Sequence, residues 1–132
     1  MSSYMTTDPP RPTNAELEIL TVLWSLGPAT VREVYNVISR RRPAQYSTVL
    51  KFMQIMAEKG LVLRDEKPRA HVYKSARPRE WTQRQLAGDL MERAFSGSAK
   101  ALLMGALSAR KTSRAELTEL RKLLDEYRKG KK

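Results

Sequence analysis

The sequence contains no cysteine and only one histidine, His71, among its 132 residues. Without cysteine the chain has no disulfide, no thiol nucleophile and no thiolate metal site. A single histidine leaves little scope for a histidine-based metal site or a catalytic triad, and His71 is expected to be an ordinary strand residue. The sequence also shows no phosphate-binding loop. We therefore expect no catalytic residue, no metal site, no cofactor and no small-molecule substrate.

Long apolar runs are also missing. No stretch approaches the roughly 18 consecutive apolar residues of a membrane-spanning helix. Residues 1–12 are polar and lack the basic region followed by an apolar region that marks a secretion signal. The sequence therefore predicts a protein that stays in the cytoplasm.

Acidic residues are scarce relative to basic ones. The chain has 25 Lys and Arg against 14 Asp and Glu, a formal net charge of +11 at pH 7. Such an excess favours a polyanionic partner, with nucleic acid ahead of an anionic membrane surface. The length excludes a large multidomain enzyme, and a hydrophobic fraction of 41% allows a modest core in one domain or two small units.

The first half of the chain shows the element order of a winged helix-turn-helix domain. Residues 1–13 hold three of the seven prolines and are expected to be a disordered tail. We then expect a helix capped by Asn14 and ended by Gly27, a helix opened by a capping box of Thr30 and Glu33, and a helix over residues 47–59. Apolar alternation over 61–64 and 71–74 predicts a hairpin. Three helices and a hairpin place a winged DNA-binding domain at residues 14–76.

The third predicted helix carries a candidate DNA-contacting face. At 100° per residue, one polar arc lies opposite an apolar stripe of Val49, Phe52, Met53 and Met56. Glutamine bonds adenine, lysine reaches guanine or phosphate, hydroxyls bond phosphates or bases, and an apolar side chain can contact a thymine methyl group. The alternative is an ordinary solvated helix face. The arc is formed by Ser47, Lys51, Gln54 and Glu58, with Thr48 and Leu50 beside it.

Cations flank this face. Arg41 and Arg42 close the preceding helix, and Lys67 and Arg69 lie at the predicted hairpin tip. Arginines also suit a helix C-terminus, and turns are commonly charged and solvated. Because cations lie on both sides of the same polar arc, we predict DNA contacts from these four cations together with Ser47, Thr48, Leu50, Lys51 and Gln54.

The second half is predicted to be an all-helical dimerisation domain over residues 77–128, so that the fold is mainly α. The segment 99–109 is apolar nearly all round, and Ser113 with Glu116 opens a last helix by a second capping box. Three helices of about 50 residues are a small unit to stand alone, which favours a homodimer over folding back within one chain. Residues 129–132 are expected to form a basic tail. The predicted dimer contacts are Leu90, Leu102, Leu103, Leu117, Leu120 and Leu124.

Four stretches carry a resemblance to a known family: NAELEILTVLW (14–24), YSTVLKFMQIMAEKGLV (46–62), HVYKS (71–75) and SRAELTELRKLL (113–124). In this order and spacing the sequence resembles the penicillinase repressors of the BlaI/MecI type from residue 14 to about 128. The resemblance implies a dimeric winged-helix repressor on a palindromic operator of a β-lactamase or related antibiotic-resistance operon. It also places base contacts on Ser47, Thr48, Leu50 and Lys51.

The resemblance implies a release mechanism as well. In β-lactam-responsive members a membrane-bound sensor protease inactivates the repressor by cleavage in the dimerisation region. The matching bond here lies between Gly105 and Ala106, whereas well-known members have Asn followed by Phe at this bond. Copper-responsive relatives carry a C-terminal cysteine cluster, which this chain lacks.

Two other functions stay open at this point. Residues 76–132 carry a net charge of +7 against +4 for residues 1–75, and this distribution suits a nonspecific or architectural nucleic-acid-binding protein. A dimeric adaptor that binds another protein is also compatible with the helical second half.

Overall fold

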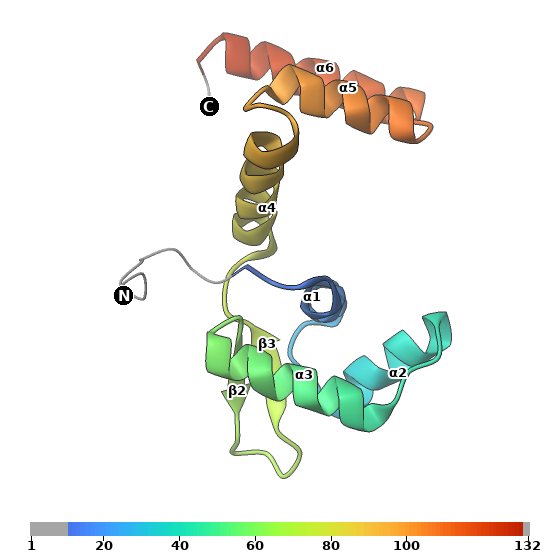
Figure 1. Ribbon diagram of the computed structural model, residues 1–132, viewed down its shortest axis with the longest axis vertical. Helices are drawn as coiled ribbons and strands as arrows, with labels where there is room; N and C mark the ends of the chain where they lie inside the picture. Colours follow the sequence, from blue (N-terminus) through green and yellow to red (C-terminus); the bar gives the residue numbers. More distant parts are fainter. Residues whose placement is uncertain (1–10, 131–132) are drawn as a thin grey trace. The chain divides into compact units, whose positions relative to one another are not determined.

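The computed structural model describes residues 11–130, so the expectations for residues 1–10 and 131–132 lie outside it. The fold is mainly α, as predicted, with a small sheet in the first half (Figure 1). The chain divides into two compact units, of which the first extends to Leu86 and the second begins at Ala87. The elements are α1 (Asn14–Leu26), β1 (Ala29–Thr30), α2 (Val31–Arg41), α3 (Tyr46–Lys59), β2 (Val62–Asp65), β3 (Val72–Ser75), α4 (Arg79–Ala94), α5 (Ala99–Ala109) and α6 (Arg114–Arg128).

The first helix begins one residue earlier than the sequence suggested. Thr13, rather than Asn14, is its N-cap: the Thr13 hydroxyl accepts from the backbone N–H of Glu16 at 3.2 Å, and Glu16 accepts from the Thr13 N–H at 2.9 Å. The prediction of Asn14 was wrong because both residue types cap well, and only the reciprocal bond with Glu16 selects Thr13. Gly27, with φ of 81°, ends the helix as expected.

The next two helices follow their local signals. The capping box of Thr30 and Glu33 opens α2, where Glu33 accepts from the Thr30 N–H at 2.8 Å. Gly60 ends α3 in the left-handed conformation, with φ of 82°, which favours a residue without Cβ. Strand β2 of the hairpin begins at Val62, two residues after Gly60, so the chain passes directly from α3 into the hairpin.

The predicted hairpin is confirmed and is part of a three-stranded antiparallel sheet with the order β1-β3-β2. Val62 pairs with Ser75, and Asp65 pairs with Val72. The strands are shifted by one residue from the predicted ranges, which leaves His71 just before β3 rather than inside it. The two-residue strand β1 was not predicted, because two residues cannot display an alternating pattern.

The core of the first unit lies where α1, α2 and α3 meet β2 and β3. Its largest fully buried side chains include Tyr73, Leu20 and Met53. One acidic residue is buried with them: Glu16 is 2% exposed, and both of its oxygens accept from the Lys59 ammonium at 2.9 Å. Burial opposes ionisation of Glu16, but the hydrogen bonds from Lys59 and Thr13 and the charge of Lys59 outweigh it and lower the pKa.

Replacing Glu16 with alanine is expected to lower the free energy of unfolding by about 2 kcal/mol, because it leaves Lys59 without its buried partner and α1 without half of its capping box. Since the folded chain holds the pKa of Glu16 below its ordinary value of 4.5, this contribution is present above pH 4.5 and is lost as the pH falls through the lower, folded-state pKa. Urea unfolding between pH 3 and 7 measures the effect. Glu58→Gln, on the exposed face of α3, is the control, and equal losses in both variants would contradict the assignment.

The second unit has helices but no core of its own. Ser98 caps α5 and Ser113 caps α6, each accepting from the backbone N–H three residues later, which gives one of the two bonds of the capping box predicted at Ser113. None of the residues 87–130 is buried. A separate finding is that no helix within residues 11–130 is both long and apolar enough to cross a membrane.

Candidate nucleic-acid interface

The outer face of α3 is exposed, as the wheel predicted. Lys51 and Gln54 lie in solvent, while Val49, Met53 and Met56 on the opposite side are at most 4% exposed. Phe52 differs from the prediction: it is only half-buried, because it borders a surface cavity instead of entering the core. The remaining predicted contacts on this helix are Ser47 and Thr48, which are exposed, and Leu50, which is half-buried.

The N-terminus of α3 has no side-chain cap, since Gln45 makes no such hydrogen bond. Its first-turn backbone N–H groups and the positive end of the helix dipole therefore lie beside the hydroxyls of Ser47 and Thr48. This arrangement suits a phosphate group.

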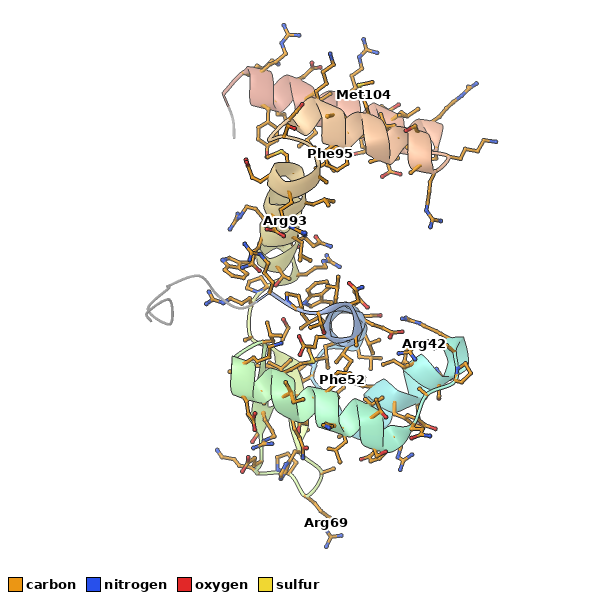
Figure 2. The ribbon with its side chains drawn as sticks, viewed as in Figure 1. Arg42, Phe52, Arg69, Arg93, Phe95 and Met104 are labelled. Carbon is orange, nitrogen blue, oxygen red and sulfur yellow. The ribbon has the colours of Figure 1, made fainter. Side chains whose placement is uncertain are left out.

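A hollow of about 220 Å³ lies between α3 and the hairpin. Leu50 and Gln54 line it from α3, and Arg69 lines it from the hairpin tip. Figure 2 shows Arg69 at the end of the hairpin, extending away from the body of the first unit. None of the residues lining this hollow is acidic. The fold thus gathers three of the predicted contacts around one positively charged hollow, and Arg69 is at least 15 residues from the other two in sequence.

Two further residues of this hollow were not predicted. Arg32, in the first turn of α2, places its guanidinium carbon 4.2 Å from the ring centroid of Tyr46, the first residue of α3. Tyr35 meets the same ring edge-on, with centroids 5.7 Å apart and an interplanar angle of 75°. No spacing in the sequence indicates this cluster, because it forms only when α2 and α3 pack together.

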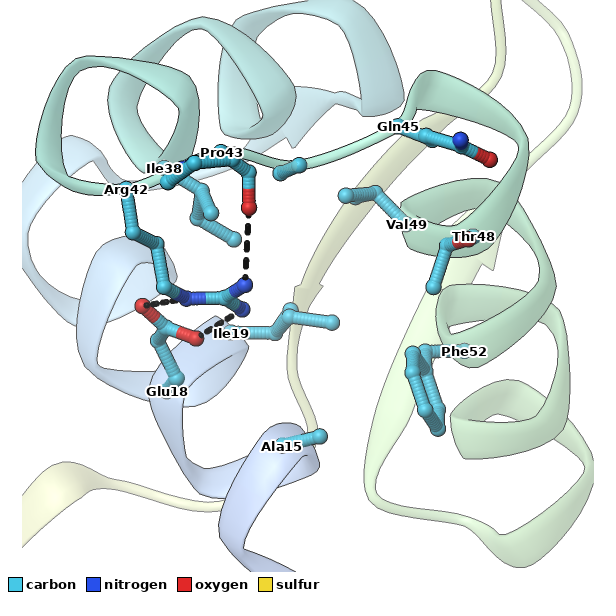
Figure 3. Close-up of a pocket in the computed structure, with 11 residues that line it drawn as sticks. Ala15, Glu18, Ile19, Ile38, Arg42, Pro43, Gln45, Thr48, Val49 and Phe52 are labelled. Carbon is cyan, nitrogen blue, oxygen red and sulfur yellow. Dashed lines mark hydrogen bonds and ion pairs between the residues drawn. The ribbon is translucent and has the colours of Figure 1, made fainter.

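Arg42 already forms hydrogen bonds with other residues of the protein. Its guanidinium donates to both carboxylate oxygens of Glu18, at 2.6 and 3.3 Å, and to the carbonyl of Pro43 at 3.2 Å (Figure 3). The hydrogen bond from Arg42 is the main reason that the pKa of Glu18 lies below its ordinary value, with burial acting in the opposite direction. Thr48 and Phe52 line the adjoining cavity of about 260 Å³. The sequence predicted Arg42 as a DNA contact and gave no sign of its pairing with Glu18, which lies 24 residues away.

Arg41 and Lys67 remain on the surface and line neither hollow. The backbone N–H of Lys67 donates to the Asp65 carboxylate at 3.0 Å, and Arg64 pairs with Glu66 at 2.6 Å. These contacts shape the hairpin tip, while the Lys67 side chain stays exposed.

The helices of the second unit expose three of the six leucines predicted at a dimer interface. Leu90, Leu117 and Leu124 are 42%, 44% and 52% exposed, whereas Leu102, Leu103 and Leu120 are half-buried. Figure 2 shows Met104 extending outward from α5. Four large apolar side chains join these residues on the surface without having been predicted as contacts: Met104, Leu107, Leu123 and Tyr127.

The candidate cleavage bond lies inside a helix. Gly105 and Ala106 belong to α5, and a Cβ at Gly105 would come within 3.3 Å of the Phe95 ring. Gly105 therefore has a packing role, since it lets the aromatic ring approach the α5 backbone. A protease would have to open this helix before reaching the bond.

Comparisons with known proteins find one family model and two relatives that are similar to this chain. A family model described as penicillinase repressor matches residues 12–126. The chain is also similar to the transcriptional regulator BlaI of Mycobacterium tuberculosis, from both strain CDC 1551 / Oshkosh and strain ATCC 25618 / H37Rv, with 37% identity over 91 residues. That match covers 67% of this chain and 66% of each relative, just under two thirds of the relatives' length.

Proposed function

Because this chain belongs to the penicillinase repressor family, whose members are transcriptional repressors and not enzymes, we propose that it represses transcription as a homodimer bound to a palindromic operator. Occupying a promoter requires no chemistry, only affinity and sequence discrimination. The regulated genes in this proposal are a β-lactamase or a related antibiotic-resistance operon. A repressor that acts on operator DNA is expected to work in the cytoplasm.

The single observation that carries the proposal is the outer face of α3. Gln54 and Leu50 border a hollow that contains cations and no acids, and Lys51 lies in solvent beside them. An α-helix that presents such side chains fits the major groove, while the hairpin with Arg69 and Lys67 contacts the adjoining backbone. The family resemblance supports base contacts for Leu50 and Lys51 among these residues.

Dimerisation is proposed from the second unit. Its helices carry exposed leucines, yet no residue from 87 to 130 is buried in the single chain. Amphipathic helices need a surface against which to bury their apolar stripe, and a second copy supplies one. A two-fold dimer in turn favours an operator with two symmetric half-sites.

We also propose that repression is relieved through an upstream sensor, with a membrane-bound protease cutting between Gly105 and Ala106. Cleavage at this bond would require α5 to open and the protease to accept Gly-Ala in place of Asn-Phe. Incubation with the cognate sensor protease followed by mass measurement tests it. Fragments divided after Gly105 are expected, and an intact chain would count against cleavage at this position.

Fluorescence anisotropy with the DNA upstream of the protein's own gene tests sequence-specific binding. At matched salt we expect that duplex to bind at least ~1000-fold more tightly than a scrambled one. A ratio near one, with a steep salt dependence, would instead indicate a nonspecific or architectural nucleic-acid-binding protein, which the +7 charge of residues 76–132 would suit.

A further inference from the structure

We propose that Arg32, held on the ring of Tyr46, is a binding site for a DNA backbone phosphate at the wing side of α3. The inference rests on the proposed function for the presence of DNA, and it adds a contact that neither the sequence pattern nor the family assignment supplies.

Arg32 lies where a phosphate would pass. It lines the same hollow as Leu50 and Gln54 of α3 and Arg69 of the hairpin. When α3 occupies a major groove, one DNA strand must run along the edge between the helix and the hairpin. Arg32 is exposed at this edge, in the first turn of α2.

The side chain of Arg32 is ordered without being neutralised. Its guanidinium carbon is 4.2 Å from the centroid of Tyr46 and 5.6 Å from that of Tyr35. Among the described residues, Arg32 forms no ion pair with a carboxylate. A contact with an aromatic ring fixes the long side chain but leaves its charge and N–H donors for another partner. Arg42 differs, since Glu18 already occupies its guanidinium.

The neighbouring charges favour an anion. Arg69 lines the same hollow, and none of its lining residues is acidic. The nearby carboxylate of Glu33 accepts from the Thr30 N–H at 2.8 Å, within the capping box of α2. A planar guanidinium that is already ordered binds a phosphate oxygen with little further loss of side-chain entropy. The arrangement therefore anchors the start of α3 to the backbone of one strand.

The test compares the full-length protein with Arg32→Gln, using anisotropy over a series of salt concentrations on the upstream duplex and on a scrambled duplex. Removing one phosphate contact is expected to weaken binding about fivefold on both duplexes and to reduce the slope of log affinity against log salt by about 0.9. Arg32→Lys, which keeps the charge but loses the planar fork, should keep the slope and recover part of the affinity. Tyr46→Leu should weaken binding severalfold because it frees the side chain of Arg32.

Arg84→Gln is the matched control, because it removes one exposed arginine of the first unit from α4. Its slope should stay close to that of the unaltered protein. Thermal unfolding of all variants separates a structural role from a binding role: Arg32→Gln should melt normally. An unchanged slope in Arg32→Gln, or an equal change in Arg84→Gln, would overturn the proposal.

A methylphosphonate scan locates the contact. In this scan one backbone phosphate at a time is replaced by a neutral methylphosphonate. At one position per half-site, the replacement should weaken binding of the unaltered protein but cause no further loss in Arg32→Gln. If the loss from the methylphosphonate and the loss from Arg32→Gln add at every position, the assignment is overturned. If the unaltered protein fails to distinguish the upstream duplex from the scrambled one, the proposed function fails, while the salt slope on either duplex still decides whether Arg32 binds a phosphate.

Discussion

Replacing Lys51 and Gln54 together with alanine is expected to weaken operator binding by about 100-fold, but binding to a scrambled duplex by less than about tenfold. Both side chains lie on the exposed face of α3, and Gln54 also borders the hollow between α3 and the hairpin. Glutamine bonds adenine through two donor and acceptor positions, so its loss removes an interaction that exists only with the correct base. Lysine contributes partly through phosphate, which accounts for the smaller loss on scrambled DNA.

Anisotropy on both duplexes at one salt concentration measures this difference. The matched control is the double variant Gln83→Ala and Lys100→Ala, which removes the same two residue types from exposed positions on α4 and α5. The control should keep the specificity ratio of the unaltered protein. Equal losses on operator and scrambled DNA in the α3 variant would show that this face provides charge and not base recognition.

Much of the first unit could be predicted because the ends of its helices depend on local chemistry. Gly60 ends α3 and the capping box of Thr30 with Glu33 opens α2, and each signal involves residues within one helical turn. The buried side of α3 followed equally from its period, since Val49, Met53 and Met56 are separated by steps of three or four. These local signals also fixed which face of α3 meets solvent.

The features of the first unit that could not be predicted depend on contacts between segments that are distant in sequence. Strand β1 exists only because Ala29 and Thr30 pair with Tyr73 and Val72. The pairing of Arg42 with Glu18 and the stacking of Arg32 on Tyr46 require helices that are adjacent in space. Charge counting therefore pointed to the region that we propose to bind DNA, but it could not show that Arg42 is paired with Glu18 while Arg32 stacks on Tyr46.

The second unit shows the same limit in another form. Periodicity identified α6 and its leucine stripe, yet a stripe has two possible uses, burial within the chain or against another chain. The absence of any buried residue from 87 to 130 favours the second use. Met104 and Tyr127, which are about 60% exposed, belong to the same surface that a partner would cover.

Replacing Leu124 with glutamate is therefore expected to convert the protein to a monomer at micromolar concentration. Leu124 is 52% exposed in the single chain, and a carboxylate at this position would have to lose its hydration when two copies meet. We expect the dimer dissociation constant to rise by at least ~100-fold. Operator affinity should fall by about 100-fold or more, because a monomer no longer engages both half-sites at once.

The matched control is Thr118→Glu, which adds the same charge to α6 on the side opposite Leu120 and Tyr127, where Thr118 is exposed and its hydroxyl donates to the Arg114 carbonyl. Sedimentation velocity should find the control dimeric and the Leu124 variant monomeric. The monomer should keep the affinity of the unaltered protein for a single half-site, because Leu124 lies outside the first unit, which holds the α3 face and the hairpin. A Leu124 variant that remains dimeric would exclude this stripe as the interface, and loss of half-site binding would mean that the substitution disturbed the first unit.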